Sequence, residues 1–339
     1  MRKVTYKFSN SSVDYFLAGG ISHLKKIVDQ KNAIIITDEN VYDAHTKRFK
    51  GWNCIVLKPG EEYKVQSTVD AIIEQLIEME ADRKTTLIGV GGGVITDITG
   101  YVASVYMRGI PFGFIPTTLL AMVDASIGGK NGIDAGVYKN MVGIIRQPKF
   151  ILHDMVFLNT LPQSEWENGF AEIIKHAAIK DAAMFHQLEN SSFKKYKGSK
   201  NAICDLVQRN AIIKTKVVKQ DEFEKGERRL LNFGHTLGHA LENQYELSHG
   251  RAISIGMTYA SVISEKITGF KEASRVTNLL LRYDLPTFAE FAKQKVFEVL
   301  KMDKKRERKE INYVMLERIG KGVVKPIEVK KLEDLISSI

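Results

Sequence analysis

The sequence is poor in cysteine and proline and contains no long apolar run. Cys54 and Cys204 are the only cysteines among 339 residues, and they are widely separated. Neither a disulfide framework nor a thiolate metal site is therefore indicated. No segment has the unbroken apolar length of a membrane span, and the seven prolines form no proline-rich linker. We expect a cytoplasmic protein with no membrane partner.

The start of the sequence lacks the apolar run and the cleavage site of a signal peptide. Residues 4–8 instead alternate between polar and apolar side chains, which predicts an edge strand. With 44% hydrophobic and 26% charged residues, the composition is that of an ordinary globular protein. A chain of this length is long for a single core and suits two domains.

The formal net charge of +9 limits the choice of partner without deciding it. Basic residues are scattered, and the one dense run, residues 304–309, is interrupted by Glu307. We interpret that run as a solvated loop or helix face rather than a nucleic-acid site. Positive charge also attracts phosphorylated small molecules, and we expect such a substrate and no nucleic-acid partner.

Strand and helix signals alternate in the first half of the chain. Residues 33–38 and 85–90 are short, β-branched apolar runs typical of buried parallel strands, and residues 68–80 between them have apolar side chains at helical spacing. After about Pro162 helical signals dominate until residues 311–316 predict a late strand. We expect an α/β, Rossmann-like nucleotide-binding domain over 1–155, a mainly α-helical metal and substrate domain over 156–339, and an active site in the cleft between them.

Glycines gather where a strand is expected to run into a helix, in residues 89–97. Glycines there would let backbone amides approach a pyrophosphate at the N-terminus of the helix predicted for residues 94–107. The pattern differs from G-x-G-x-x-G because its last position is Val94, and no acidic residue ends a second strand about 20 residues later. A tight turn without a ligand is the alternative.

Two further segments mix polar and apolar side chains. Residues 59–64 place two carboxylates and a lysine in a turn after a strand, where they could reach ribose hydroxyls. Residues 115–130 combine hydroxyls, a carboxylate, glycines and a lysine with apolar side chains, and residues 139–140 add another cation and an amide. Such polar groups are costly in a core unless they bind something.

The histidines of the second half indicate a metal site. His235 and His239 are four residues apart and share one helix face, so the pair could hold a divalent ion with His249 nearby. An upstream helix, with a capping box at residues 164–167 after Pro162, carries Glu172 and His176 on one face. Either of these two could be a further ligand, or Glu172 could be an exposed residue in a helical salt bridge.

Four segments together resemble the 3-dehydroquinate synthase family. They are residues 92–94 with Asp97, residues 116–130, residues 171–175 and residues 231–240. They occur in the order that the family shows and span nearly the whole chain. The long segment that ends at Lys130 is very specific.

The resemblance implies a dehydroquinate synthase-like fold and a phosphorus–oxygen lyase of the shikimate pathway. Such an enzyme converts 3-deoxy-D-arabino-heptulosonate 7-phosphate to 3-dehydroquinate by transient NAD oxidation, phosphate elimination, re-reduction and an intramolecular aldol closure. The resemblance also implies one divalent metal ion, zinc or cobalt, held by Glu172, His235 and His249, and a homodimer.

The resemblance further implies which residues bind NAD and substrate. The NAD site would include Asp38, Glu61, Lys64, Gly92, Gly93, Val94, Asp97, Thr117, Thr118, Leu120, Asp124, Lys130, Lys139, Phe157 and Thr160. The substrate would meet Arg108, Asp124, Lys130, Asn140, Lys175, Lys214, Glu224, Arg228, Asn232, His239 and one of Lys304 and Lys305.

Some positions depart from the family pattern, and two other functions share much of it. Arg251 stands where relatives usually have glutamate after His-Gly. His176 takes a place often held by tyrosine, and we interpret His176 as a supporting residue.

A different sugar phosphate cyclase would also recycle NAD, but Lys214, Asn232 and His239 match the dehydroquinate-forming pattern. A metal-dependent NAD(P) polyol dehydrogenase would share the two-domain plan and accumulate NADH.

Overall fold

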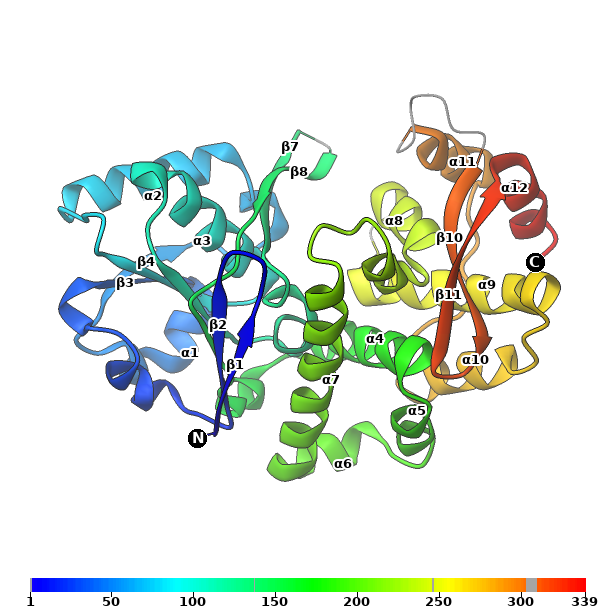
Figure 1. Ribbon diagram of the computed structural model, residues 1–339, viewed down its shortest axis with the longest axis horizontal. Coiled ribbons are helices and arrows are strands. Elements are labelled where there is room, and N and C mark those ends of the chain that lie inside the picture. The colour runs from blue at the N-terminus through cyan, green and yellow to red at the C-terminus, as the bar shows by residue number, and fades with distance from the viewer. Residues whose placement is uncertain (1, 137, 246, 303–309) are drawn as a thin grey trace. The chain divides into compact units, whose positions relative to one another are not determined.

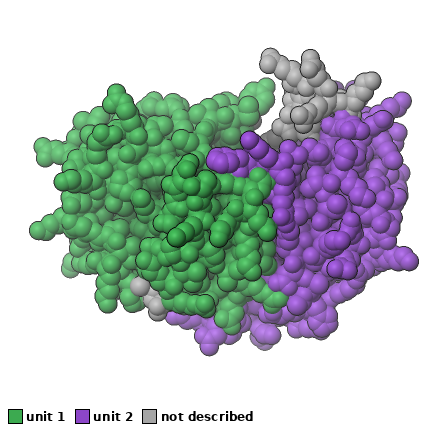
Figure 2. Space-filling view, in the orientation of Figure 1, with its two compact units in different colours: residues 1–162, 203–222 green, residues 163–202, 223–339 purple. Residues whose placement is uncertain are grey.

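The structure is a computed structural model that describes every residue except 1, 137, 246 and 303–309 (Figure 1). The chain forms two compact units, which Figure 2 distinguishes by colour. The first contains Met1–Pro162 and Ile203–Glu222, and the second contains Gln163–Ala202 and Phe223–Ile339. Residues 203–222 thus group with the first half of the chain.

A seven-stranded sheet forms the centre of the first unit, in the order β1-β2-β9-β6-β5-β3-β4. Its strands are β1 (Arg2–Lys7), β2 (Ser12–Leu17), β3 (Ala33–Asp38), β4 (Asn53–Leu57), β5 (Thr86–Gly91), β6 (Phe112–Pro116) and β9 (Phe150–Leu152). Only β1 pairs antiparallel, with β2; the other pairs are parallel. The predicted edge strand and the two predicted buried strands are confirmed as β1, β3 and β5.

Helices pack their apolar faces on this sheet. They are α1 (Glu39–Phe49), α2 (Gln66–Glu78), α3 (Gly93–Val105) and, from Ile203 onward, α7 (Lys200–Gln220). Ile72 of α2 and Val102 of α3 lie in one core cluster with Leu87 of β5. From α7, Ala211 joins the same cluster and Thr215 donates a hydrogen bond of 3.0 Å to the Tyr15 hydroxyl. The predicted helices at 68–80 and 94–107 are confirmed, with ends shifted by about two residues.

The carboxyl ends of three adjacent parallel strands bring several predicted residues to one edge of the sheet. Asp38 ends β3 and caps α1, Gly92 caps α3 directly after β5, and Thr117 follows β6. The Thr117 amide donates to the Gly91 carbonyl at 2.9 Å, which ties the two turns together. Ligands of open α/β sheets bind at this edge. Next to it lie the π-helical turn η5 (Ala121–Ala125) and the ribbon of β7 (Lys130–Ala135) and β8 (Tyr138–Ile145).

The second unit is mainly helical. It contains α4 (Gln163–Lys180), α5 (Ala182–Glu189), α6 (Phe193–Gly198), α8 (His235–Gln244), α9 (His249–Thr268), α10 (Ala273–Arg282), α11 (Lys293–Met302) and α12 (Val329–Ser337), with the hairpin β10 (Glu310–Arg318) and β11 (Lys321–Glu328). The predicted late strand lies within β10. The predicted capping box required Ser164 to precede the first turn of the helix. Since α4 begins at Gln163, Ser164 lies inside that turn instead.

Helices α8 and α9 approach each other closely through glycines. A Cβ atom at Gly256 of α9 would lie 1.9 Å from the Gly234 carbonyl oxygen, just before α8, and one at Gly238 would lie 2.6 Å from the Ile253 side chain. Gly234 also has a φ of +80°, which favours glycine. Within the ranges that the structure describes, no helix is long and apolar enough to cross a membrane.

Candidate active site

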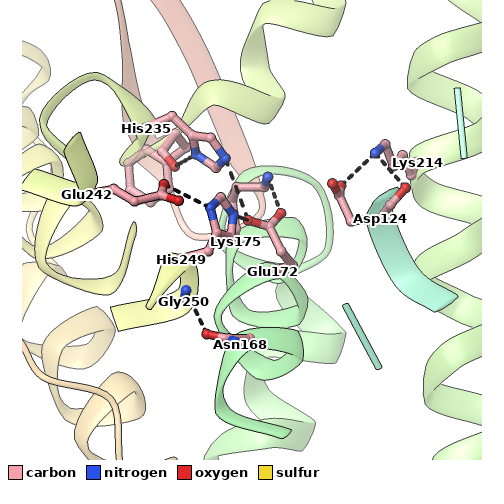
Figure 3. A network of polar contacts seen from close by, with 10 residues as sticks. Asp124, Asn168, Glu172, Lys175, Lys214, His235, Glu242, His249 and Gly250 are labelled. Atoms are coloured by element: carbon pink, nitrogen blue, oxygen red, sulfur yellow. Dashed lines mark hydrogen bonds and ion pairs between the residues drawn. The ribbon is translucent and has the colours of Figure 1, made fainter. Parts of the chain in front are cut away.

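Three side chains of the second unit converge on one point. Glu172 lies in the middle of α4, His235 is the first residue of α8 and His249 is the first residue of α9. The Nε2 atoms of His235 and His249 lie 3.6 and 3.4 Å from the same Glu172 oxygen, Oε1 (Figure 3). One ligand atom from each residue lies within 4.8 Å of the others. Two imidazoles and a carboxylate form a donor set suited to zinc or cobalt.

Hydrogen bonding orients His235 as a ligand. Its Nδ1 lies 3.2 Å from the Phe233 carbonyl oxygen, so Nδ1–H donates to the backbone and the Nε2 lone pair faces Glu172. Burial and the nearby Lys175 ammonium hold the pKa of His235 well below its usual value. His235 is therefore neutral at physiological pH, which is the form that coordinates a metal.

His249 lies between two carboxylates. Its Nδ1 is 3.3 Å from Oε2 of Glu242, on the opposite side of the ring from Glu172. Burial by itself would lower the pKa of His249, but hydrogen bonds to Glu172 and Glu242 and their negative charges raise it to about 9. The site therefore attracts positive charge, and a divalent cation fits the arrangement.

The structure excludes one alternative for Glu172, that of an exposed residue. Its carboxylate pairs with the Lys175 ammonium, as the helical spacing allowed, yet its side chain is fully buried and not exposed. His176 is also buried, but the group of possible ligands with His235 and His249 includes Glu172 and not His176. His239, one turn beyond His235, groups instead with Glu242 and His249.

The start of α9 is attached to α4 next to these ligands. The Gly250 amide donates to Oδ1 of Asn168 at 2.9 Å, one helical turn before Glu172 (Figure 3). A Cβ atom at Gly250 would lie 2.5 Å from the Asn168 Cα. Arg251, which departs from the family pattern, lies 3.5 Å from Oε2 of Glu167. Its charge is therefore paired locally within the second unit.

In the first unit, three predicted residues surround the Lys64 ammonium. Its Nζ lies 2.6 Å from Oδ2 of Asp97 and 3.6 Å from Oε1 of Glu61, and it donates to Oδ1 of Asn140 at 2.7 Å. Burial opposes the charge of Lys64, but the carboxylates of Asp97 and Glu61 raise its pKa. Asn140, predicted to meet the substrate, thus lies among residues predicted to bind NAD.

The turn between β5 and α3 is shaped for a close-lying ligand. Gly92 caps α3, Gly93 begins it and Val94 follows in its first turn. A Cβ atom at Gly92 would lie 3.0 Å from the Thr118 methyl carbon. The Thr117 hydroxyl is buried and has no hydrogen-bond partner within the described part of the chain. An unsatisfied buried hydroxyl next to a helix N-terminus fits a bound phosphorylated nucleotide.

Other residues predicted to bind NAD also belong to the first unit. Leu120 precedes η5, and Phe157 and Thr160 lie in the 3₁₀ helix Met155–Thr160. The Thr160 hydroxyl is 3.0 Å from Nε2 of His45, whose ring meets Phe157 edge to face. His45 belongs to no motif, so its contacts with these two residues were not predicted.

The residues predicted to bind the substrate fall into local groups. In the first unit, the Lys214 ammonium of α7 donates to the Asp124 carbonyl oxygen at 2.7 Å and lies 2.8 Å from Oδ1 of the same residue (Figure 3). In the second unit, Asn232 donates to Oε1 of Glu224 at 2.7 Å, and Arg228 is buried in the same segment. The side chains of Arg108, Lys130, Lys139 and His239 are exposed. Lys304 and Lys305 lie outside the described residues.

Glu242 was also missed, although a sequence signal was available. It lies three residues after His239 and seven after His235, so all three share one face of α8.

The fold and the site together define a class of enzyme with an α/β nucleotide unit and a helical metal unit. A 2-epi-5-epi-valiolone synthase from Streptomyces hygroscopicus, solved with NAD+ and Zn2+, matches with a TM-score of 0.87 and 26% identity over 100% of this chain and 99% of that chain. A probable glycerol dehydrogenase from Sinorhizobium meliloti shares the fold, with a TM-score of 0.62 and 16% identity over 98% of this chain and 97% of that one.

Sequence comparison narrows this class to one family. Residues 54–168 match the family model described as 3-dehydroquinate synthase N-terminal, and residues 169–306 match the C-terminal one. A 3-dehydroquinate synthase from Campylobacter concisus is 38% identical over 331 residues, which cover 94% of each chain. The chain belongs to the 3-dehydroquinate synthase family, which confirms the resemblance found in the sequence.

Proposed function

We propose that this chain is a lyase that converts 3-deoxy-D-arabino-heptulosonate 7-phosphate to 3-dehydroquinate and phosphate. The observation that carries the proposal is the buried Glu172 carboxylate with two imidazole Nε2 atoms facing one of its oxygens. This donor set occurs in a chain that two family models of the synthase match over most of its length. The reaction belongs to the shikimate pathway.

Glu172, His235 and His249 are proposed to hold one zinc or cobalt ion. The relative from Streptomyces was solved with Zn2+, which supports a divalent ion in this fold. A bound ion would supply positive charge that acidifies a coordinated hydroxyl group. The neighbouring Lys175 ammonium, fully buried beside Glu172, is positioned to meet an anionic group of the substrate.

The carboxyl edge of the parallel sheet is proposed to bind NAD, which would accept and return hydride. Gly92 and Gly93 would present backbone amides to the pyrophosphate, and the buried Thr117 hydroxyl would gain a partner. The Lys64 group, with Asp97 and Glu61, would supply charged and polar contacts to the ribose side of the nucleotide.

Cationic and amide groups are proposed to hold the sugar phosphate. Lys214 is fixed by two oxygens of Asp124, so its charge is positioned before substrate arrives. Arg228 and Asn232, with Arg108, Lys130, His239 and one of Lys304 and Lys305, would neutralise or orient the phosphate, carboxylate and hydroxyl groups. We propose that the protein is a cytoplasmic homodimer.

Turnover with trace NAD tests the function. Purified protein is incubated with the heptulosonate phosphate, Zn2+ and NAD at far below the substrate concentration. We expect phosphate and dehydroquinate in equal amounts, well above the amount of NAD, and loss of both products with a chelator or in Glu172→Ala. Net NADH would instead identify a polyol dehydrogenase, and phosphate release only from another sugar phosphate would identify another cyclase.

A further inference from the structure

Glu242 lies beside the proposed metal site without belonging to the ligand set assigned above. It lies on α8, two helical turns after His235, and its side chain is 13% exposed. Helix α8 therefore carries one predicted ligand at its first residue and, further along the same face, a carboxylate that reaches His249 at the start of the next helix.

The two ring nitrogens of His249 face different carboxylates. Nδ1 is 3.3 Å from Oε2 of Glu242, and Nε2 is 3.4 Å from Oε1 of Glu172. When Nδ1–H donates to Glu242, the lone pair of the neutral ring lies on Nε2 and faces the other two ligands. Without this acceptor, the ring could rotate or take the other tautomer.

His249 needs such an anchor more than His235 does. His235 is 12% exposed and donates to a carbonyl only two residues away, at Phe233. His249 is 27% exposed, as the first residue of its helix, and its Nδ1 partner comes from a different helix. Partner groups of this kind, which contact a metal-ligating histidine, typically change metal affinity by 10- to 100-fold when removed.

We propose that Glu242 is a positioning residue that fixes the ring of His249 and raises the affinity of the site for a divalent metal ion. The proposal rests on the proposed function, because it assumes the ligand set Glu172, His235 and His249. Glu242 itself is not assigned as a ligand.

Metal affinity measured without turnover tests the proposal. Full-length protein is stripped of metal, and Zn2+ is titrated in competition with a chromophoric chelator; Co2+ is added separately to record the visible spectrum of the site. For Glu242→Ala we expect one equivalent of zinc bound roughly 10- to 100-fold more weakly, with the cobalt spectrum of the wild type. Glu242→Gln retains an oxygen acceptor and should fall between the two.

Glu265→Ala, which removes an exposed carboxylate from α9, is the matched control and should bind as the wild type does. Thermal unfolding of the metal-free proteins checks that the variants fold, and Glu242→Gln serves if Glu242→Ala does not. Wild-type affinity in the folded Glu242 variants would overturn the positioning role. A cobalt spectrum changed in both variants would also overturn it, because Glu242 would then be a ligand. Failure of the wild type to bind either ion would instead refute the metal assignment of the proposed function.

Discussion

Replacing Gly256 by alanine should separate helices α8 and α9 and weaken both the fold and the metal site. The new Cβ atom would lie 1.9 Å from the Gly234 carbonyl oxygen and 3.0 Å from the Gly238 amide nitrogen. Both obstacles are backbone atoms, so no side-chain rotation can relieve the contact. The helices must move apart by roughly 1 Å before the contact reaches the 3.0 Å below which real Cβ atoms are essentially never found.

Two opposing effects set the size of the change. Overpacking of a well-packed interior typically costs 1–3 kcal/mol, and the backbone obstacle places Gly256→Ala at the upper end. Alanine gains up to about 1 kcal/mol over glycine inside a helix. We therefore expect the free energy of unfolding to fall by about 2 kcal/mol, which corresponds to a decrease in Tm of roughly 4–8 °C for a unit of this size.

The same displacement should reach the ligands, because His235 begins α8 and His249 begins α9. Urea unfolding of the metal-free protein and zinc competition are the two measurements. The control is Gly198→Ala, at the end of α6, where a Cβ atom meets nothing within 4 Å and stability should be unchanged or slightly higher. If Gly256→Ala is as stable as Gly198→Ala and binds zinc as the wild type does, the described packing of α8 on α9 is wrong.

Three further predictions concern the first unit. Burial lowers the pKa of His153 to about 4, and its hydrogen bond to the Met122 carbonyl offsets this only in part. Because the unfolded chain binds the proton near pH 6.5, the free energy of unfolding should fall as the pH drops from 6.5 toward 4, by about 2 kcal/mol at pH 5. In urea unfolding, His153→Gln should show a flatter pH dependence. Lys214→Ala should lower kcat/KM by about 100-fold or more, whereas zinc affinity, measured by competition, should stay unchanged; equal losses in both would contradict a substrate role. Lys64→Gln should weaken NAD binding in calorimetry and leave the Asp97 carboxylate without its cation, and adding Asp97→Asn should restore part of the lost stability.

Local patterns predicted the elements that have a strong periodicity of their own. The β-branched runs that became β3 and β5 are buried on both faces, so their composition alone identified them. The return of α7 to the first unit had no such signal, because Thr215 meets its partner Tyr15, 200 residues earlier in the chain, only in the folded structure. A periodic pattern shows which face is apolar but not which core receives it.

The metal site was predicted in a similar, partial way. Helical spacing placed His235 and His239 on one face and suggested both as ligands, and only the resemblance separated their roles. The structure brings His249 and Glu172 to His235 and pairs His239 with Glu242 and His249. Spacing along one helix cannot show which atoms from other helices will meet it, so Glu242 was missed and Glu172 could not be distinguished from an exposed residue.

The position of both histidines at helix N-termini explains why carboxylates are needed there. The unpaired amides of a first helical turn carry partial positive charge, which disfavours a cation by roughly 0.3–1 kcal/mol at each terminus. His235 and His249 both begin helices, so a divalent ion between them would face two such termini. Glu172 supplies one full negative charge but shares it with Lys175. The second charge, on Glu242, offsets what Lys175 and the helix termini remove, and for this reason Glu242→Gln, which keeps the acceptor oxygen, should still bind zinc less tightly than the wild type.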